Sequence, residues 1–477
     1  MDPLLDRDNA ADLLADVAAA APGYLADLPD RLVRDVASHH LLDGLDGPLP
    51  EDGHGSPGSI AELLRIGTSA ATHSSGPRFF HFVVGGSTPA AMAGDWVTSL
   101  LDQLSGMWAA SPFAITAETV ALRWLKDLFG LPPDWGGVLT PSATFANLTG
   151  LACARQWWGE QHGVDVAADG IAGLPRTPVI ASGYVHPSVR KALQILGCGR
   201  DTVQVHARDD AGRADLDGMR RALADTGPAV LVASAGEVNA GDFDPIDAMA
   251  DLAAEHRAWL HVDGAFGLFA ALSPRTAHLV DGVARADSVA ADGHKWLNVP
   301  YESGFAFVRQ AHRLGETFGS WNAPYLAPED ENSVDYNCLG PESSRRARAL
   351  PIWASLRAYG RAGYRAMIER HLDLAERLEF LVEESPDLEL LAPAQLCVVC
   401  FRYTAAGRDL DALNAALGRA ILDDGRVYVG TTVYRGMTAL RPAIVNWRTT
   451  EADIDLLVTV VRELGARLQL IDSAKIM

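Results

Sequence analysis

Five short runs rich in valine, isoleucine and alanine constrain the fold of this chain more than any other feature. They lie between residues 86 and 310, and helix-like stretches separate them: PVIASG, DTVQVHA, AVLVASAG, WLHVDGA and DSVAAD. Such alternation of strands and helices predicts an α/β fold, a mostly parallel sheet with helices on both faces. Several of the runs end in small or polar residues. Because open α/β sheets bind ligands at the carboxyl ends of their strands, we expect the functional site there.

The segments on either side of this region predict two further parts. Residues 1–85 show helical periodicity interrupted by LDGPLPEDGHGSPGS, which predicts a helical arm with little core of its own. Residues 320–344 show no sustained period and read as a long loop. A long helical stretch then leads into four strand-like runs, so the predicted parts are the arm at 1–85, a large α/β domain at 86–360 and a small α+β domain at 361–477.

The charge of the chain excludes two classes of partner. The sequence has 61 acidic and 40 basic residues, a formal net charge of −21, which repels nucleic acid backbones and anionic lipid surfaces. No apolar run approaches the roughly 18 to 20 residues of a membrane helix, and the acidic start is unlike a signal peptide. We therefore expect a cytoplasmic enzyme or binding protein with no nucleic acid or membrane partner.

The cysteines predict neither a disulfide framework nor a metal site. Five cysteines in 477 residues form a sparse, odd-numbered set, so reduced thiols are the expectation. Cys397 and Cys400 form a C-x-x-C pair within LCVVCFRY, but that run reads as a strand, and residues three apart on a strand point to opposite faces. With no second such pair and no histidine cluster nearby, a buried strand is the preferred interpretation.

Two neighbouring segments carry the chemistry of the chain. HVDGAF places Asp263 at the tip of an apolar strand, and DSVAADGHKWLN places Lys295 just after the next strand. Each alone is typical of a turn or a surface charge. Together they fit pyridoxal phosphate, which needs a lysine amine for a Schiff base and a carboxylate that keeps its pyridine nitrogen protonated. PSATFANLTG at 141–150 resembles a helix start that would attract a phosphate, and His186 offers a flat ring to lie against the pyridine.

The order of these motifs resembles a known family. PSATFANL, YVHPSVRKA, AGEVNAGDFDPI, HVDGAFG and DGHKWLNVPYESG follow one another as in the group II pyridoxal phosphate-dependent decarboxylases, which include the aromatic amino acid and glutamate decarboxylases. The resemblance covers about residues 75–465. It implies the fold of aspartate aminotransferase, with a mostly parallel seven-stranded sheet flanked by helices, and an enzyme that decarboxylates an L-amino acid to an amine and carbon dioxide. It also implies a homodimer with sites at the subunit interface.

Carried over by motif, the resemblance implies that eight residues bind the cofactor: Ser142, Ala143, Thr144, His186, Asp263, Ala265, His294 and Lys295. Lys295 would form the Schiff base and Asp263 would pair with the pyridine nitrogen. Ala265 and His186 would lie against opposite faces of the ring, and residues 142–144 would hold the phosphate.

Other segments match the family's substrate contacts. PRFFHFVVGGSTPAAM resembles the segment that walls the substrate pocket, through Phe82, Val83 and Gly85. Its apolar and aromatic character favours an aromatic or other hydrophobic substrate over glutamate. Arg345, within SSRRARALPIW, is predicted to contact the loop or the substrate, with a solvated basic face as the alternative.

Two positions depart from the family pattern. Glu237 and Val238 follow Gly236 where many members have threonines, and Asp292 stands where relatives have asparagine. A carboxylate near a phosphate repels it unless the carboxylate is protonated or turned away. We therefore expect the phosphate to depend on residues 142–144 and on groups that the sequence does not identify, including some from a second subunit.

A tyrosine is the expected proton donor of the reaction. After carbon dioxide leaves, an acid must protonate the α-carbon, and Tyr325 in APYLAP matches the tyrosine that the family carries in the loop after the lysine. An aromatic residue that only anchors the loop is the alternative role. An aminotransferase, an aldehyde-forming enzyme and a cofactor-binding protein without turnover remain the competing functions.

Overall fold

A seven-stranded sheet forms the centre of the protein. The computed structural model describes residues 2–319 and 334–476, and the strand order in this sheet is β1-β7-β6-β5-β4-β2-β3. Strands β6, β5, β4, β2 and β3 are parallel, whereas β7 runs antiparallel to both β1 and β6. The strands are β1 Gly136–Thr140, β2 Val179–Ala181, β3 Val203–Val205, β4 Val230–Ser234, β5 Trp259–Asp263, β6 Ser288–Asp292 and β7 Gly304–Val308.

The predicted α/β fold is confirmed. All five predicted runs are strands of this sheet, namely β2 to β6. The two strands that the sequence analysis missed, β1 and β7, each begin with glycine, which is a poor strand former. They pair with each other and close one side of the sheet.

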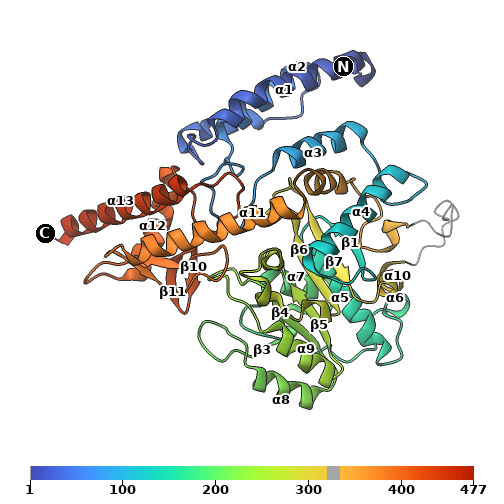
Figure 1. Ribbon diagram of the computed structural model, residues 1–477. Coiled ribbons are helices and arrows are strands. Elements are labelled where there is room, and N and C mark those ends of the chain that lie inside the picture. The colour runs from blue at the N-terminus through green and yellow to red at the C-terminus, as the bar shows by residue number, and fades with distance from the viewer. Residues whose placement is uncertain (1, 320–333, 477) are drawn as a thin grey trace.

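Helices cover the sheet on both faces (Figure 1). Every residue of β4, β5, β6 and β7 is buried, as parallel sheets require. Helix α5 packs on β5, β6 and β7, and α9 packs on β4 and β5. The helices of this region are α3 Pro89–Leu101, α4 Pro112–Phe129, α5 Ala143–Glu160, α6 Val166–Asp169, α7 Pro187–Ile195, α8 Leu216–Thr226, α9 Ile246–Glu255 and α10 His312–Phe318.

A second, antiparallel sheet of order β10-β11-β9-β8 belongs to the carboxyl-terminal region. The long helix α11, Ala349–Glu383, leads into it, and Gly360 interrupts this helix with a φ of 60°. We propose this kink as the boundary between the large and small domains, since it falls at the predicted division between 360 and 361. The remaining elements are β8 Leu388–Leu390, β9 Phe401–Tyr403, α12 Leu410–Asp424, β10 Thr431–Tyr434, β11 Met437–Leu440 and α13 Glu451–Ile476.

The amino-terminal arm contributes little to the core. Helices α1, Ala10–Asp27, and α2, Gly55–Ala70, lie side by side at the edge of the molecule, above α3 in Figure 1. Helix α1 has no buried residue, and α2 buries only Ile66 and Ala70. The predicted interruption is shorter than expected, because α2 begins inside it.

Cys397 and Cys400 are buried, but they precede strand β9 rather than forming part of it. Burial raises the pKa of Cys400 to about 12, so its thiol stays protonated. No helix within residues 2–319 and 334–476 combines the length and the apolar character needed to cross a membrane.

Candidate active site

A cavity of about 160 Å³ opens where strands β4, β5 and β6 end. The last residues of these strands, Ser234, Asp263 and Asp292, all contribute to its wall. All eight residues that the sequence analysis assigned to the cofactor meet here. The cavity is lined by Ser142, Ala143, Thr144, Tyr184, His186, Ser188, Ser234, Gly236, Glu237, Val238, Asp263, Ala265, Phe266, Asp292, His294 and Lys295.

Lys295 lies in a single π-helical turn, Gly293–Leu297, directly after β6. Such turns are rare and often occur at functional sites. The Lys295 ammonium lies 3.2 Å from the Asp292 carboxylate, and the same carboxylate lies 3.5 Å from His294 Nε2 and accepts a hydrogen bond from the Ala143 amide. Asp292 therefore forms a local ion pair with the lysine instead of facing the cavity as a free charge.

Asp263 is held in one orientation at the end of β5. Its Oδ2 accepts a hydrogen bond of 2.9 Å from the Asn147 side-chain amide, and its Oδ1 accepts one of 3.2 Å from the Ala265 backbone. The carboxylate is 6% exposed, so these protein donors take the place of water.

His186 caps the amino terminus of helix α7. Its Nδ1 accepts hydrogen bonds from the Ser188 backbone amide at 3.1 Å and pairs with the Ser188 hydroxyl at 2.7 Å. Burial lowers the pKa of His186. The imidazole is therefore neutral near pH 7, with its proton on Nε2.

The amino terminus of α5 provides a site for an anion. Its N-cap residue, Ser142, makes no side-chain capping hydrogen bond, and its first turn faces the cavity through Ala143 and Thr144. The backbone amides and the dipole of such a terminus attract phosphate. One of these amides, that of Ala143, is already bonded to Asp292.

Glu237, the first departure from the family pattern, folds back onto its own turn. Its two carboxylate oxygens accept hydrogen bonds from the backbone amides of Asn239 and Ala240. Burial raises the pKa of Glu237, and the nearby Arg441 guanidinium opposes that rise. Arg441 is half-buried, and its buried Nη1 atom has no hydrogen-bond partner within the described part of the chain.

The segment predicted to wall the substrate pocket packs against the lysine backbone. The Gly85 amide donates to the His294 carbonyl at 3.1 Å, and a Cβ atom at Gly85 would lie 1.8 Å from the Lys295 carbonyl oxygen, so only glycine fits. Phe82 is 61% exposed and Val83 is buried, both with φ of 58°. None of these three residues lines the cavity in the described structure, and their role as substrate contacts stays a prediction.

Arg345 occupies a different place from the one predicted. Its guanidinium forms a buried bidentate ion pair with Glu118, with N–O distances of 2.7 and 3.1 Å, and also donates to the backbone carbonyls of Ser105 and Leu139. The two side chains are 1% and 0% exposed. Arg345 is neither a solvated surface charge nor part of the cavity wall, because its buried guanidinium is fully engaged by Glu118 and the two backbone carbonyls.

Two further points concern residues outside this cavity. Tyr325, the predicted proton donor, lies outside the described residues.

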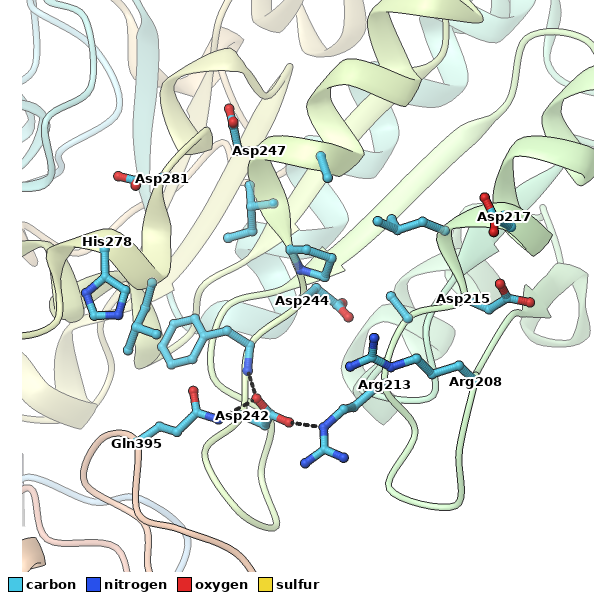
Figure 2. A pocket seen from close by; sticks show the side chains of 17 residues that line it. Arg208, Arg213, Asp215, Asp217, Asp242, Asp244, Asp247, His278, Asp281 and Gln395 are labelled. Atoms are coloured by element: carbon cyan, nitrogen blue, oxygen red, sulfur yellow. Dashed lines mark hydrogen bonds and ion pairs between the residues drawn. The ribbon is translucent and has the colours of Figure 1, made fainter.

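A larger cavity of about 920 Å³ lies elsewhere on the large domain, and Figure 2 shows its wall of aspartates with Arg208, Arg213 and His278. Within this wall Asp242 accepts hydrogen bonds from Arg213 and Gln395, and no lysine is among the lining residues. The lysine chemistry is therefore confined to the smaller cavity.

The sequence analysis missed the polar residues behind the cavity. Asn147 and Ser188 connect Asp263 to His186 through hydrogen bonds, and His261 bonds to Asn147 from the other side. The only signal for Asn147 was an amide side chain within the stretch TFANLTG, and it did not indicate a partner.

The residues of the cavity fit pyridoxal phosphate. The cofactor requires an amine, a carboxylate for its ring nitrogen, a flat surface for its ring and an anion site for its phosphate. Lys295, Asp263, His186 and the amino terminus of α5 offer these four groups around one cavity.

Comparisons with known proteins agree with this chemistry. Residues 42–404 match the family model described as "Pyridoxal-dependent decarboxylase conserved domain". Tryptophan decarboxylase 1 from Oryza sativa subsp. japonica is 32% identical over 416 residues, covering 81% of this chain and 80% of the relative. L-2,4-diaminobutyrate decarboxylase from Rhizobium meliloti (strain 1021) is 30% identical, covering 97% and 91%.

Solved structures give the same result. The crystal structure of Oryza sativa TDC with PLP and tryptamine superposes with a TM-score of 0.89 at 27% identity, covering 97% of this chain and 99% of that one. The family model spans most of the chain, and the two relatives named above are decarboxylases of amino acids. The chain therefore belongs to the pyridoxal-dependent decarboxylase family and is a pyridoxal phosphate-dependent carboxy-lyase that acts on an amino acid.

Proposed function

We propose that this enzyme decarboxylates an L-amino acid with an aromatic or other hydrophobic side chain. The observation that carries this proposal is that the carboxylates around the cavity are already hydrogen-bonded to the protein and are not free to bind a charged substrate side chain. Among the described lining residues, the three carboxylates of Glu237, Asp263 and Asp292 each accept hydrogen bonds from the protein. The apolar surfaces of Val238 and Phe266 remain for a substrate side chain. The apolar segment at 77–92 lies against the lysine backbone and supports the same conclusion.

The cavity residues divide the work of holding the cofactor. When bound, pyridoxal phosphate supplies a conjugated ring that takes up the electrons released as carbon dioxide leaves the α-carbon. Lys295 would hold the cofactor through its amine, and Asp263 would pair with the ring nitrogen and keep it protonated. His186 and Ala265 would contact the ring, and residues 142–144 would receive the phosphate.

Arg441 is the group we assign to the substrate's α-carboxylate. Its Nη1 atom is buried without a hydrogen-bond partner in the described part of the chain, and the guanidinium lies close enough to His81, His186 and Glu237 to shift their pKa values. A buried guanidinium N–H without an acceptor is costly, and a carboxylate that accepts from it removes that cost. The Arg441→Met variant should therefore raise KM for the amino acid while the affinity for the cofactor changes little.

A symmetric homodimer is the proposed assembly. Large apolar side chains are exposed on the arm and on the adjacent helix α3, where Leu63 is 56% and Leu100 is 68% exposed. Because α1 buries none of its own residues, a second copy is the partner that would cover this surface. Light scattering should give twice the mass of one chain. A monomer that is fully active at nanomolar concentration would contradict the proposal.

We also propose a cytoplasmic location. The support is that all five cysteines are free thiols, which suits a reducing compartment.

The test of the proposed function is a product assay with the holoenzyme and each of the twenty protein amino acids, with 2,4-diaminobutyrate added to the set. We expect an amine and carbon dioxide in equal amounts, with the highest kcat/KM for an aromatic or large aliphatic substrate. Highest activity with glutamate or diaminobutyrate would overturn the side-chain assignment. A keto acid product would indicate an aminotransferase, and an aldehyde with ammonia and peroxide would indicate the aldehyde-forming alternative.

A further inference from the structure

A chain of hydrogen bonds runs behind the cavity from strand β5 to Asp263 and His186, two of the residues assigned to the cofactor ring. Trp259 Nε1 donates to Ser288 Oγ at 2.9 Å, and Ser288 Oγ lies 2.8 Å from His261 Nδ1. His261 Nε2 lies 2.9 Å from Asn147 Oδ1, and Asn147 Nδ2 donates to Asp263 Oδ2 at 2.9 Å. These links all lie inside the protein, since His261 and Asn147 are both 0% exposed.

The two ends of this chain fix the direction of every bond in it. The Trp259 indole can only donate and an ionised Asp263 can only accept. The Asn147 amide must therefore turn its NH₂ group toward Asp263 and its oxygen toward His261. His261 then carries its proton on Nε2 and accepts from the Ser288 hydroxyl at Nδ1. Burial lowers the pKa of His261 to about 4, so it remains neutral and keeps this arrangement near pH 7.

A branch of the same chain reaches His186. The second hydrogen of the Asn147 amide points to Ser188 Oγ at 3.1 Å, and the Ser188 hydroxyl lies 2.7 Å from His186 Nδ1. With its oxygen accepting from Asn147, Ser188 donates its own proton to His186. This bond and the Ser188 backbone amide both require an unprotonated Nδ1, which leaves the His186 proton on Nε2.

Close packing of helix α5 on the sheet makes the hydrogen bond between Asn147 and His261 possible. Gly150 follows Asn147 by one helical turn, on the same face of α5. A Cβ atom at Gly150 would lie 2.9 Å from the His261 ring and 3.0 Å from Ser288. The absence of a side chain there lets the helix approach until Asn147 reaches His261.

We propose that Asn147, supported by His261, is a positioning residue that sets the orientation of the Asp263 carboxylate and the tautomer of His186 at the same time. This inference rests on the cofactor assignment and not on the identity of the substrate. One amide thereby couples the group under the ring nitrogen to the group that lies on the ring face. Its effect should appear in the affinity and the spectrum of the bound cofactor before any substrate is added.

The test compares Asn147→Ala with Asn414→Ala. Asn414 is also 0% exposed and also makes three hydrogen bonds through its side chain, to Tyr403 and Leu410 in the small domain. Both variants should lower the thermal stability of the cofactor-free protein. Only Asn147→Ala should raise the Kd for pyridoxal phosphate, by about 10- to 100-fold, since it removes a hydrogen bond to a charged group. It alone should also change the position or intensity of the visible absorbance band.

A second pair of variants tests the direction of the chain without removing Asn147. The Gln amide of His261→Gln can donate to Asn147 and accept from Ser288, whereas the side chain of His261→Leu can do neither. The Gln variant should retain the parent spectrum and Kd, and the Leu variant should resemble Asn147→Ala. Equal behaviour of the two His261 variants, or a parent-like Kd and spectrum in Asn147→Ala, would overturn the inference. Both readouts precede catalysis, so a failure of the proposed amine product would leave this test unaffected.

Discussion

Replacement of Arg345 separates a structural role from a substrate contact. In the structure its guanidinium donates two hydrogen bonds to Glu118 and two to backbone carbonyls, all within a fully buried site. In the Arg345→Met variant Glu118 would be left as an unpaired buried charge. Breaking a buried ion pair in this way costs about 3–5 kcal/mol.

A second substitution should recover part of this loss. Glu118 also accepts hydrogen bonds from the Ser105 hydroxyl at 3.0 Å and the Leu139 amide at 3.1 Å. In the Arg345→Met/Glu118→Gln double variant the charge is gone, and the Gln carbonyl can still accept one of these bonds. The double variant should still be less stable than the parent by about 1–3 kcal/mol, because the Ser105 and Leu139 carbonyls no longer accept hydrogen bonds from a guanidinium. The double variant should therefore be more stable than Arg345→Met by about 2 kcal/mol.

The assay is urea unfolding of the holoenzyme followed by tryptophan fluorescence, with KM measured on the same samples. Arg346→Met is the control, because the neighbouring Arg346 forms a half-exposed pair with Asp95 and should cost at most about 1 kcal/mol. If Arg345→Met raised KM with no loss of stability, Arg345 would be a substrate contact and the structural role would be wrong. The Glu118→Gln variant is measured as well. If the loss of unfolding free energy in the double variant equalled the sum of the losses in Arg345→Met and Glu118→Gln, the charge-burial argument would be refuted.

Three further predictions test the chemistry and the core. Asp263→Ala should weaken cofactor retention and nearly abolish turnover, because the ring nitrogen loses its counter-charge; undiminished activity would contradict its role. Tyr325→Phe should still release carbon dioxide but shift the product from amine toward aldehyde with ammonia and peroxide, whereas a variant that makes only amine at the parent rate would assign the proton to another acid. His371 is fully buried, and burial lowers its pKa to about 3, so its neutral form stabilises the fold above pH 6.5 and that stability is lost as the pH falls toward 3. Urea titrations of the parent and of His371→Gln measure this effect as the difference between their free energies of unfolding. The difference, parent minus variant, should decrease by up to about 1.4 kcal/mol for each unit by which the pH falls from 6.5 toward 3. A difference that stays constant with pH would contradict the burial argument.

Local patterns in the sequence were enough to predict strands β2 to β6 and the edge of the sheet at which the cavity lies. The runs that became β2, β4, β5 and β6 are short and apolar, and every residue of these strands is buried, so their composition reports their environment directly. Asp263 and Lys295 follow two adjacent strands, and parallel strands bring their carboxyl ends together. The resemblance to the decarboxylase family rested on the same segments, and the family is confirmed.

Strands β1 and β7 show where local patterns fail. Their sequences, GGVLT and GFAFV, begin with glycine and are too short to be recognised by period alone. They are strands because each finds a partner far away in the chain, with Gly136 opposite Val308 and Thr140 opposite Gly304. Pairing over such a distance leaves no trace in the neighbouring residues.

The sequence by itself determined which residue types are available for the cofactor: a lysine, a carboxylate and an imidazole at the ends of predicted strands. Only the tertiary structure decided how each is held. It paired Arg345 with Glu118 instead of with substrate, turned Glu237 onto its own turn, and placed Asn147 between Asp263 and His261. The physical reason is that a buried polar group must find a partner, and the choice of partner depends on which segments folding brings within about 3 Å of it.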